Sequence, residues 1–247
     1  MNADDVISAL ALPPQARIDQ KVPKKHLIDH GAVTATDKKS ITEGVEELLW
    51  VAALKPSTVG VPAYEDAERQ YLEVAVLTLS LREGAKAGRL RELVHRAIPY
   101  PVVLLATDAH GLVLSLCELR HAQNEAGKMV LDGEVQAARV PGDAIGEAFR
   151  KTLAVSGLPT ADLRQLYRGW MDRLSTLEAG SILGQWPGES DPAQQRNALL
   201  AIRKIDAELA DLRRFAHEET QLARRVELNL DIKRRSAERI RLLALLG

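Results

Sequence analysis

The sequence is poor in cysteine and in aromatic residues. Of its 247 residues, one is a cysteine, Cys117, and only three Trp, four Tyr and two Phe are present. A single cysteine excludes an intramolecular disulfide and a zinc site built from several cysteines. Cys117 follows the apolar segment Leu114-Ser115-Leu116, so we expect a buried, inert thiol rather than a nucleophile. One thiol also suits a reducing compartment, which predicts a cytoplasmic protein.

Long hydrophobic runs are missing as well. Purely apolar runs are short, as in Val102–Ala106, and even the seven-residue run Leu48–Leu54 falls far below the roughly 20 residues that a membrane-spanning helix needs. The first residues, Met1-Asn2-Ala3-Asp4-Asp5, are acidic where a secretory signal carries positive charge. These features predict a protein with no membrane partner.

A large net charge of either sign is absent. The chain has 33 Lys+Arg and 34 Asp+Glu, a formal net charge of −1, which argues against a strongly basic nucleic-acid binder or an acidic tail protein. The balance is uneven along the chain, however. Residues 196–247 hold 12 Lys+Arg and 8 Asp+Glu, a net +4, and residues 1–195 hold 21 and 26, a net −5. The total therefore argues against nucleic-acid binding only for the body of the protein.

Glycine and proline are both absent between Ala193 and Leu246. Apolar residues recur there at alternating spacings of three and four, with Glu219 and Lys233 as polar exceptions, which is typical of a coiled-coil helix. About 50 helical residues would extend roughly 75 Å. We predict a long helix in a dimeric coiled coil, while a helical hairpin or a helix folded back on residues 144–183 stays open. The predicted coiled-coil core is Ile202, Ile205, Leu209, Leu212, Ala216, Ala223, Val226, Leu230, Ala237 and Ile240.

The rest of the chain mixes helical and strand patterns. Helical apolar spacing after Ser40-Ile41-Thr42-Glu43, which has the form of a capping box, predicts a helix over 40–54. Short apolar runs joined by turns predict an antiparallel meander. The other predicted elements are strands over 71–81, 101–107, 112–119 and 129–137, a short strand near 58–61, and helices over 86–98 and 163–177.

This order predicts an α+β fold: a small, mainly antiparallel sheet with flanking helices, followed by an all-α C-terminal region that ends in a long coiled-coil helix. We expect three parts. They are an α+β domain over 1–142, a helical connector over 143–192 and the long coiled-coil helix over 193–247.

Familiar catalytic motifs are missing. The sequence has no G-x-S-x-G, no G-x-x-x-x-G-K-[ST] and no G-x-G-x-x-G, so we expect no nucleotide cofactor. His26 and His30 would share a helix face, but a further ligand is lacking and we expect no metal site. Asp108 and Glu118-Leu119-Arg120 resemble a metal-nuclease pattern, yet a β-hairpin would place the two acids roughly 25–30 Å apart.

Basic residues are the candidates for nucleic-acid contact. Lysine and arginine can bind phosphates without reading the base sequence, although solvated helix faces explain most such runs. The candidates are Lys21, Lys233, Arg234, Arg235, Arg239 and Arg241.

Several segments resemble a known protein family. They are Val22-Pro23-Lys24-Lys25, Trp50-Val51-Ala52-Ala53-Leu54-Lys55-Pro56-Ser57-Thr58, Ala97-Ile98-Pro99-Tyr100-Pro101, Leu166-Tyr167-Arg168-Gly169-Trp170 and Arg225-Val226-Glu227-Leu228-Asn229. The family is the bacterial domain of unknown function 4391, and the resemblance covers nearly the whole chain. It implies no activity or catalytic residue. It does imply a setting, because members tend to be encoded beside DNA methyltransferases and helicase-type proteins of restriction or phage-defence loci.

Four polar residues of these segments are not needed for packing if they are exposed. Lys24, Lys25, Lys55 and Thr58 are therefore the candidate contact surface. We expect a non-catalytic accessory subunit of a DNA-modification or phage-defence system, with a homodimer or a partner protein bound through the C-terminal helix. A DNA methyltransferase or a helicase is a candidate partner. A sequence-nonspecific DNA-binding module and a metal-dependent nuclease are the alternatives.

Overall fold

The computed structural model describes residues 2–123, 125, 127–188 and 191–247. The chain forms two compact units, Met1–Leu174 and Ser175–Gly247, and the division falls inside helix α7 (Leu163–Leu183). The described residues include no helix that is long and apolar enough to cross a membrane. The division of the chain at residues 142 and 192 stays a prediction.

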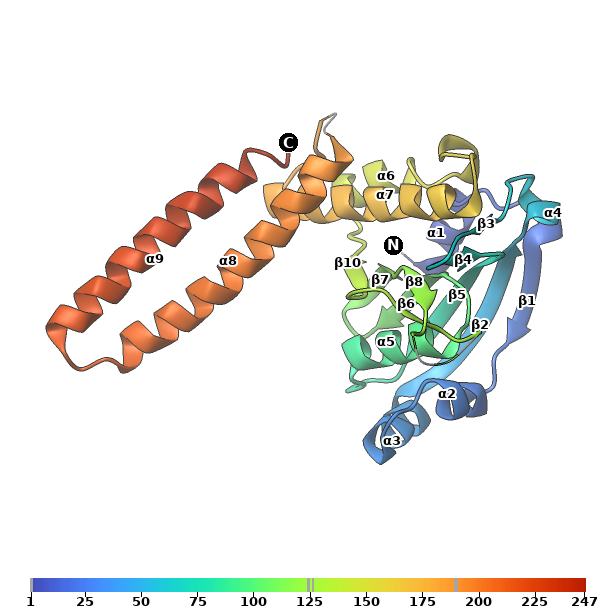
Figure 1. The fold of residues 1–247 in the computed structure, drawn as a ribbon, viewed down its shortest axis with the longest axis horizontal. Coiled ribbons are helices and arrows are strands. Elements are labelled where there is room, and N and C mark those ends of the chain that lie inside the picture. Colours follow the sequence, from blue (N-terminus) through green and yellow to red (C-terminus); the bar gives the residue numbers. More distant parts are fainter. Residues whose placement is uncertain (1, 124, 126, 189–190) are drawn as a thin grey trace. The chain divides into compact units, whose positions relative to one another are not determined.

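The first unit is built on a six-stranded sheet in the order β1-β2-β5-β6-β7-β10 (Figure 1). Strands β5 and β6 pair in parallel, and the other neighbours are antiparallel. The predicted α+β class, with a mainly antiparallel sheet and a helical C-terminal region, is confirmed. The strands are β1 (Arg17–Lys21), β2 (Val45–Leu54), β5 (Val74–Leu81), β6 (Val102–Asp108), β7 (Gly111–Leu116) and β10 (Gln136–Arg139).

Two short hairpins lie outside this sheet. They are β3 (Tyr64–Glu65) with β4 (Gln70–Tyr71), and β8 (Leu119–His121) with β9 (Met129–Leu131). The strand predicted over 129–137 is thus divided between two sheets, since β9 pairs with β8 and β10 pairs with β7.

Helices cover both faces of the sheet. Helix α5 (Ala87–Ala97) connects the parallel pair and packs with α2 (Lys24–His30) on one face of the sheet (Figure 1). The side chains of Leu77, Leu93 and Leu104 join one core there. Alternate residues of a strand point to opposite faces, so the buried Val103 and Leu105 of β6 face the other side. The remaining helices of this unit are α1 (Ala3–Ala9), α3 (Ala35–Gly44), α4 (Pro56–Val59) and α6 (Ala144–Arg150), with 3₁₀ turns at Pro14–Ala16 and Val155–Gly157.

Two aromatic residues fasten the first part of α7 within this unit. The buried Tyr167 hydroxyl accepts the backbone N–H of Cys117 at 2.8 Å and lies 2.9 Å from the carbonyl oxygen of Val102. The Trp170 Nε1–H donates to the carbonyl oxygen of Leu153 at 3.0 Å. Both polar atoms are therefore satisfied inside the core, as buried polar groups require. The segment Leu166–Trp170 thus has a structural role.

The helix predicted over 40–54 is wrong. Helix α3 ends at Gly44, and Val45–Leu54 is strand β2, paired with β1 and β5. The capping box belongs to Thr34, whose side chain accepts the Asp37 N–H, and Ser40 lies inside α3. The apolar residues of 45–52 fit a helical spacing, but two neighbouring strands offer backbone hydrogen bonds on both edges, and this tertiary pairing overrides the local pattern. The strand predicted near 58–61 is also wrong, since 56–59 form α4.

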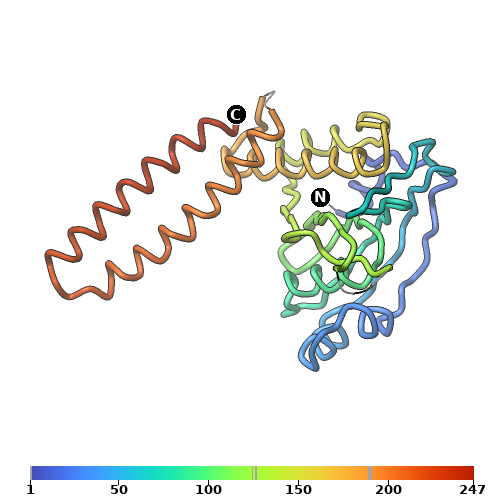
Figure 2. The backbone as a smooth tube through the Cα atoms, viewed as in Figure 1, coloured from blue at the N-terminus to red at the C-terminus, as the bar shows by residue number. Residues whose placement is uncertain are grey.

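The second unit contains the end of α7 and a helical hairpin, not one unbroken helix over 193–247. Helices α8 (Pro192–Glu218) and α9 (Leu222–Leu243) pack together, and the chain reverses between them (Figure 2). The linking residues Glu219 and Gln221 have φ of −76° and −77°, which any residue adopts. The turn therefore needs neither glycine nor proline, and it left no signal in the sequence.

The capping residue Asp37 gives the first unit a testable pH dependence. Its carboxylate accepts two hydrogen bonds from Arg89, both at 2.9 Å, and further ones from the N–H groups of Val33 and Thr34. The Arg89 guanidinium, helped by these N–H groups, holds the pKa of Asp37 well below its usual range. The ionised carboxylate thus stabilises the fold above about pH 4, the pKa of an unfolded Asp, and loses this effect as the pH falls further.

We expect Asp37→Asn to melt at a lower temperature than the wild type at pH 7. The difference between the two melting temperatures should narrow steadily from about pH 5 toward pH 2. Thermal unfolding followed by circular dichroism measures this. The exposed Asp29→Asn is the control and should leave the curve unchanged. A difference in melting temperature that does not change with pH would show that the carboxylate charge of Asp37 contributes nothing to the stability of the fold.

Candidate functional site

A cleft of about 620 Å³ opens at the edge of the α2 and α5 face of the sheet. Its lining comes from five places in the chain: β1, helix α2, strand β2 with the residue after it, the residue before β5, and the loop before β6. This volume lies within the range of small-molecule sites. The cleft is therefore the candidate functional site of the first unit.

Three of the segments that carry the family resemblance meet in this cleft. Val22 and Pro23 lie between β1 and α2, and Lys25 belongs to the first turn of α2. Trp50 and Lys55 belong to β2 and its end, and Tyr100 precedes β6. The sheet pairing brings them together, because Gln20 of β1 pairs with Trp50 of β2. Segments that are far apart in the sequence thus form one surface.

The cleft contains a nearly buried carboxylate. Glu73 lies directly before β5, its side chain is 8% exposed, and its Oε2 is 3.0 Å from Nζ of Lys55, whose side chain is 49% exposed. Lys55 is placed there by the pairing of Leu54 with Val74. The lysine thus offsets the charge of a carboxylate that water hardly reaches.

Aromatic side chains form part of the wall. The rings of Trp50 and Tyr100 are half-buried and meet edge to face, with centroids 6.4 Å apart. The Trp50 Nε1–H donates to the carbonyl oxygen of Ala52 at 3.0 Å, which fixes the ring. Both rings pack against the core under α5. The wall is therefore rigid and partly apolar.

Cations and imidazoles surround the opening. Lys21 pairs with Glu47 at 2.5 Å, an interaction that raises the pKa of Lys21. Lys25 is exposed and makes no ion pair with any residue that the structure describes. The rings of His26 and His30 lie 4.6 Å apart on α2. Across the described residues, no group of three or more His, Cys, Asp or Glu side chains is arranged to hold a metal ion.

The cleft includes two of the four candidate contact residues and leaves out the other two. Lys25 and Lys55 line it. Lys24 instead donates to the carbonyl oxygen of Thr42 at 3.2 Å. The Thr58 hydroxyl accepts the Lys55 N–H at 2.9 Å and lies 3.1 Å from the carbonyl oxygen of Ala53, so it caps α4. Sequence reasoning missed Glu73, whose only signal is an acid directly before an apolar strand.

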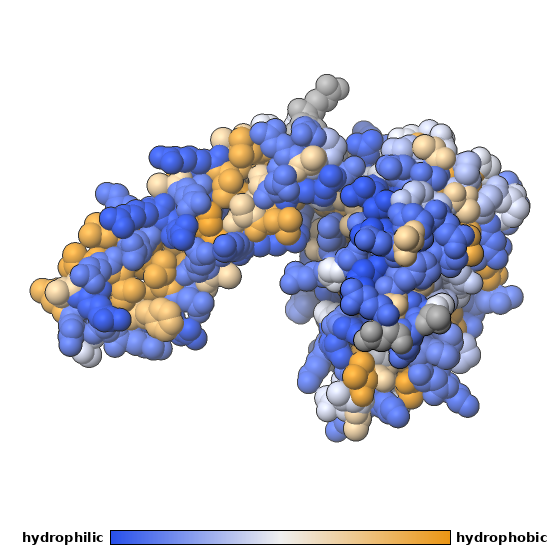
Figure 3. All heavy atoms as spheres, viewed as in Figure 1, coloured by the Kyte–Doolittle hydropathy of each residue, from blue (hydrophilic) through white to orange (hydrophobic). Residues whose placement is uncertain are grey.

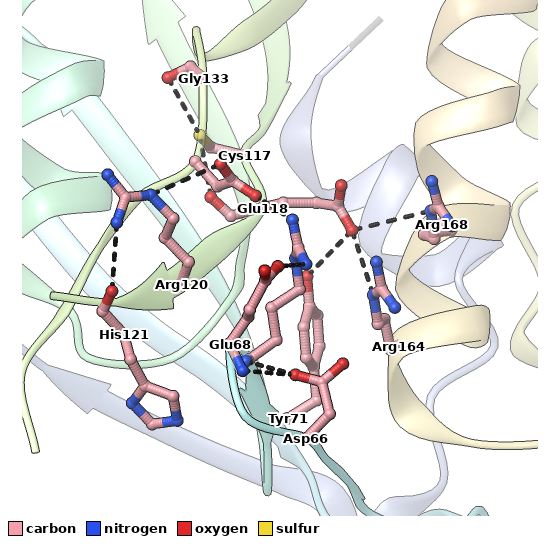
Figure 4. Close-up of polar contacts among 12 residues, drawn as sticks. Asp66, Glu68, Tyr71, Cys117, Glu118, Arg120, His121, Gly133, Arg164 and Arg168 are labelled. Carbon is pink, nitrogen blue, oxygen red and sulfur yellow. Dashed lines mark hydrogen bonds and ion pairs between the residues drawn. The ribbon is translucent and has the colours of Figure 1, made fainter. Parts of the chain in front are cut away.

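A second polar cluster surrounds Glu118 (Figure 4). Its Oε1 lies 3.4 Å from Arg164, 3.7 Å from Arg168 and 3.4 Å from the Tyr71 hydroxyl. Asp108 pairs with Gly111 at the turn of the β6–β7 hairpin, while Glu118 follows the far end of β7. The two acids of the nuclease pattern are therefore not brought together, and Glu118 serves to join α7 to the β-hairpins.

The same cluster contains Arg69, which bonds to Asp132 and, at 2.7 Å, to Glu68. The Tyr64 hydroxyl donates to Asp66 at 2.5 Å, and with backbone N–H groups it lowers the pKa of Asp66 to about 2. Cys117 is buried beside this cluster, and burial raises its pKa to about 11. Its thiol is thus protonated at neutral pH, as the sequence predicted for an inert cysteine.

Most of the basic candidates in the C-terminal unit bind acids of the hairpin itself. Arg239 lies 2.6 Å from Asp206, and Arg235 lies 3.0 Å from Glu208, so both join α9 to α8. Arg234 pairs with Asp231 at 3.3 Å. Lys233 and Arg241 are exposed on α9. Nucleic-acid contact by these residues stays a prediction.

The predicted coiled-coil core divides into two halves. In α8, Ile202, Ile205 and Leu209 are buried, and Leu212 and Ala216 are half-buried. In α9 every predicted core residue is exposed; they are Ala223, Val226, Leu230, Ala237 and Ile240. These five residues and Lys233 form what we call the outer seam of α9.

The Lys55–Glu73 pair can be tested by mutation. We expect Lys55→Ala to destabilise the protein by about 1–3 kcal/mol, because a nearly buried carboxylate loses its partner, and the partial exposure of Lys55 favours the lower end of this range. The double variant Lys55→Ala/Glu73→Gln should recover most of the loss. Urea unfolding measures both, and equal losses in the single and double variants would show that Lys55 does not compensate Glu73.

Comparison with known proteins identifies a family and nothing more specific. No curated protein and no solved structure matches the chain. The profile of the family described as Domain of unknown function (DUF4391) matches residues 10–238. This range includes the cleft and nearly all of the hairpin, and the chain therefore belongs to the DUF4391 family.

Proposed function

We propose that this protein is a non-catalytic interaction subunit that assembles through the outer seam of α9, and that its partner there is a second copy of the chain. A bacterial DNA-modification or phage-defence system is the proposed setting, and the gene neighbourhood implied by the family resemblance is what supports it. The observation that carries the proposal is the exposed apolar face of α9.

This face is unusual for a helix in a hairpin. Val226 and Leu230 are 49% and 50% exposed. Ile240 is 67% exposed, as is Leu222, which directly precedes the seam residue Ala223. Hydrophobic side chains also lie at the surface of the hairpin in Figure 3. Contiguous exposed apolar surface of this kind marks an interaction site.

Helix α9 carries two seams on opposite sides. The side toward α8 holds Leu228, Ile232, Arg235, Arg239 and Leu242, all half-buried. At about 100° per residue, the outer seam is centred roughly 165° away from this side. Because α8 covers one seam, the heptad pattern of the other is satisfied only by a further helix.

A second copy fits the outer seam if the two α9 helices run antiparallel. If Ala223 of one copy is aligned with Ile240 of the other, Val226 is aligned with Ala237, and each of these outer pairs places a large residue against a small one. The same alignment places Leu230 against Lys233 in the central pair. In the central layer the methylene stem of Lys233 covers Leu230. A parallel pair in register would instead place Lys233 against its own copy, and like charges there repel.

The charges beside the seam agree with this arrangement. In the antiparallel alignment, Glu227 of one copy lies two residues, or about 3 Å along the axis, from Arg234 of the other. The two-fold symmetry repeats the pair, so each dimer gains two ion pairs. Self-complementarity of this kind is what an isologous interface requires.

The alternative functions have less support. Arg235 and Arg239 already bind carboxylates of α8, which leaves fewer free cations for a DNA-binding module. The acidic pair on which the nuclease alternative depends is not assembled, because Asp108 and Glu118 lie at opposite ends of the β6–β7 hairpin. A methyltransferase or helicase bound to the outer seam is the competing partner, and the experiment below distinguishes it.

We expect the full chain to have about twice its 27.1 kDa mass in light scattering after size exclusion. Leu230→Gln should shift this toward the monomer, because it places a polar amide in the centre of the seam. The matched control is Arg225→Gln, which introduces the same residue at an exposed position of α9 outside the seam, and it should remain dimeric.

A wild-type monomer at every concentration would exclude the second copy as the partner. Equal dissociation of Leu230→Gln and Arg225→Gln would place the interface elsewhere.

The antiparallel orientation has its own test. Glu227→Arg and Arg234→Glu should each weaken the dimer about three- to tenfold at low salt, and the double variant should restore it, because the charges are then exchanged on both copies. Sedimentation equilibrium measures the dissociation constants. Two independent, additive losses in the double variant would contradict this pairing.

A further inference from the structure

We infer that the cleft between β1, α2 and the start of β6 binds a nucleotide unit, with its base ring against Trp50 and Tyr100 and its phosphate beside Lys25 and Lys21. This binding site lies within the first unit and is independent of the seam on α9. The ligand is a base bearing a phosphate, either as a free mononucleotide or as one nucleotide of a single strand.

The aromatic wall supports a planar ring in the cleft. Trp50 and Tyr100 are half-buried and line the cleft, and the hydrogen bond from Trp50 to Ala52 fixes the ring before any ligand arrives. Bases stack on such rings whatever their sequence, because every base presents a π face. The protein has few aromatic residues, with three Trp, four Tyr and two Phe in 247 residues, so two that share a cleft are a specific feature.

The cations supply the contact for an anion. Lys25 has no carboxylate partner among the described residues, and Lys21 shares its charge with Glu47 at the edge of the cleft. His26, from the same turn of α2 as Lys25, adds a ring nitrogen that can donate a hydrogen bond. A phosphate at this end would therefore meet a cation that has no competing partner.

The acids of the cleft define the other end of the ligand. Glu73 is nearly buried, is offset by Lys55, and keeps acceptor capacity toward the cleft. Carboxylates in proteins accept hydrogen bonds from the amino groups of bases. Asp29 is exposed at the opening, so its charge is screened by water. An inorganic phosphate alone would leave Glu73 and the aromatic wall unused.

Titration calorimetry on the full chain at low salt tests this inference. The probes are cytidine 5′-monophosphate, adenosine 5′-monophosphate, a short oligothymidylate and inorganic phosphate. We expect Lys25→Gln and Trp50→Leu each to weaken nucleotide binding about tenfold. Lys38→Gln is the matched control, because Lys38 is exposed on α3 outside the cleft, and it should bind as the wild type does.

The outcomes separate the two sources of the ligand. Binding of the mononucleotides supports a free nucleotide, whereas binding of the oligonucleotide alone supports a segment of single strand. The inference is overturned if no nucleotide probe binds, if Lys25→Gln binds like Lys38→Gln, or if inorganic phosphate binds as tightly as the nucleotides. Because Lys25 is exposed, its variant keeps the test valid even if Trp50→Leu fails to fold.

Discussion

The parallel strands β5 and β6 are buried on both faces, and the rest of the first unit follows from this constraint. Residues Val74–Leu77 and Val102–Leu105 are at most 1% exposed, so both faces of the strands need cover. Helix α5 supplies it on one side and is also the crossover that a parallel pair requires. Both strands begin at the same end of the sheet, and for this reason Glu73 and Tyr100 meet beside Lys55. The cleft is thus a consequence of the sheet topology.

The hairpin obeys a different constraint. A helix buries one stripe against one neighbour, and α9 carries two apolar stripes. Residues near the base of the hairpin pack with the end of α7, where Ala198, Leu199 and Leu246 are buried. Farther out, ion pairs such as Arg239 with Asp206 join the two helices. The unit therefore forms a regular hairpin by itself while one face of α9 remains uncovered, and this combination underlies the proposed self-assembly.

Much of the first unit could be predicted from local patterns. The apolar pattern of each segment predicts β5, β6, β7 and α5 correctly. A strand buried on both faces is a continuous apolar run, and a helix buried on one face has apolar residues at helical spacing. Strand β2 could not be predicted in this way. Its apolar residues fit both periods, and only its pairing with β1 and β5 decides between them. The cleft was equally hidden. Lys25 and Lys55 were recognised as polar and dispensable for packing, yet their meeting with Glu73 depends on strand register.

By itself, the sequence determined the α+β class, the burial of Cys117, the helical C-terminal region and the heptad spacing along α9. Each of these depends on composition or on spacing within one segment. Only the tertiary structure decided that the C-terminal region folds back at Glu219–Gln221, and that α8 packs on the other side of α9 from the predicted core. The physical reason is that a turn in ordinary extended backbone needs no glycine, and that a helix with two apolar stripes does not specify which one its neighbour covers.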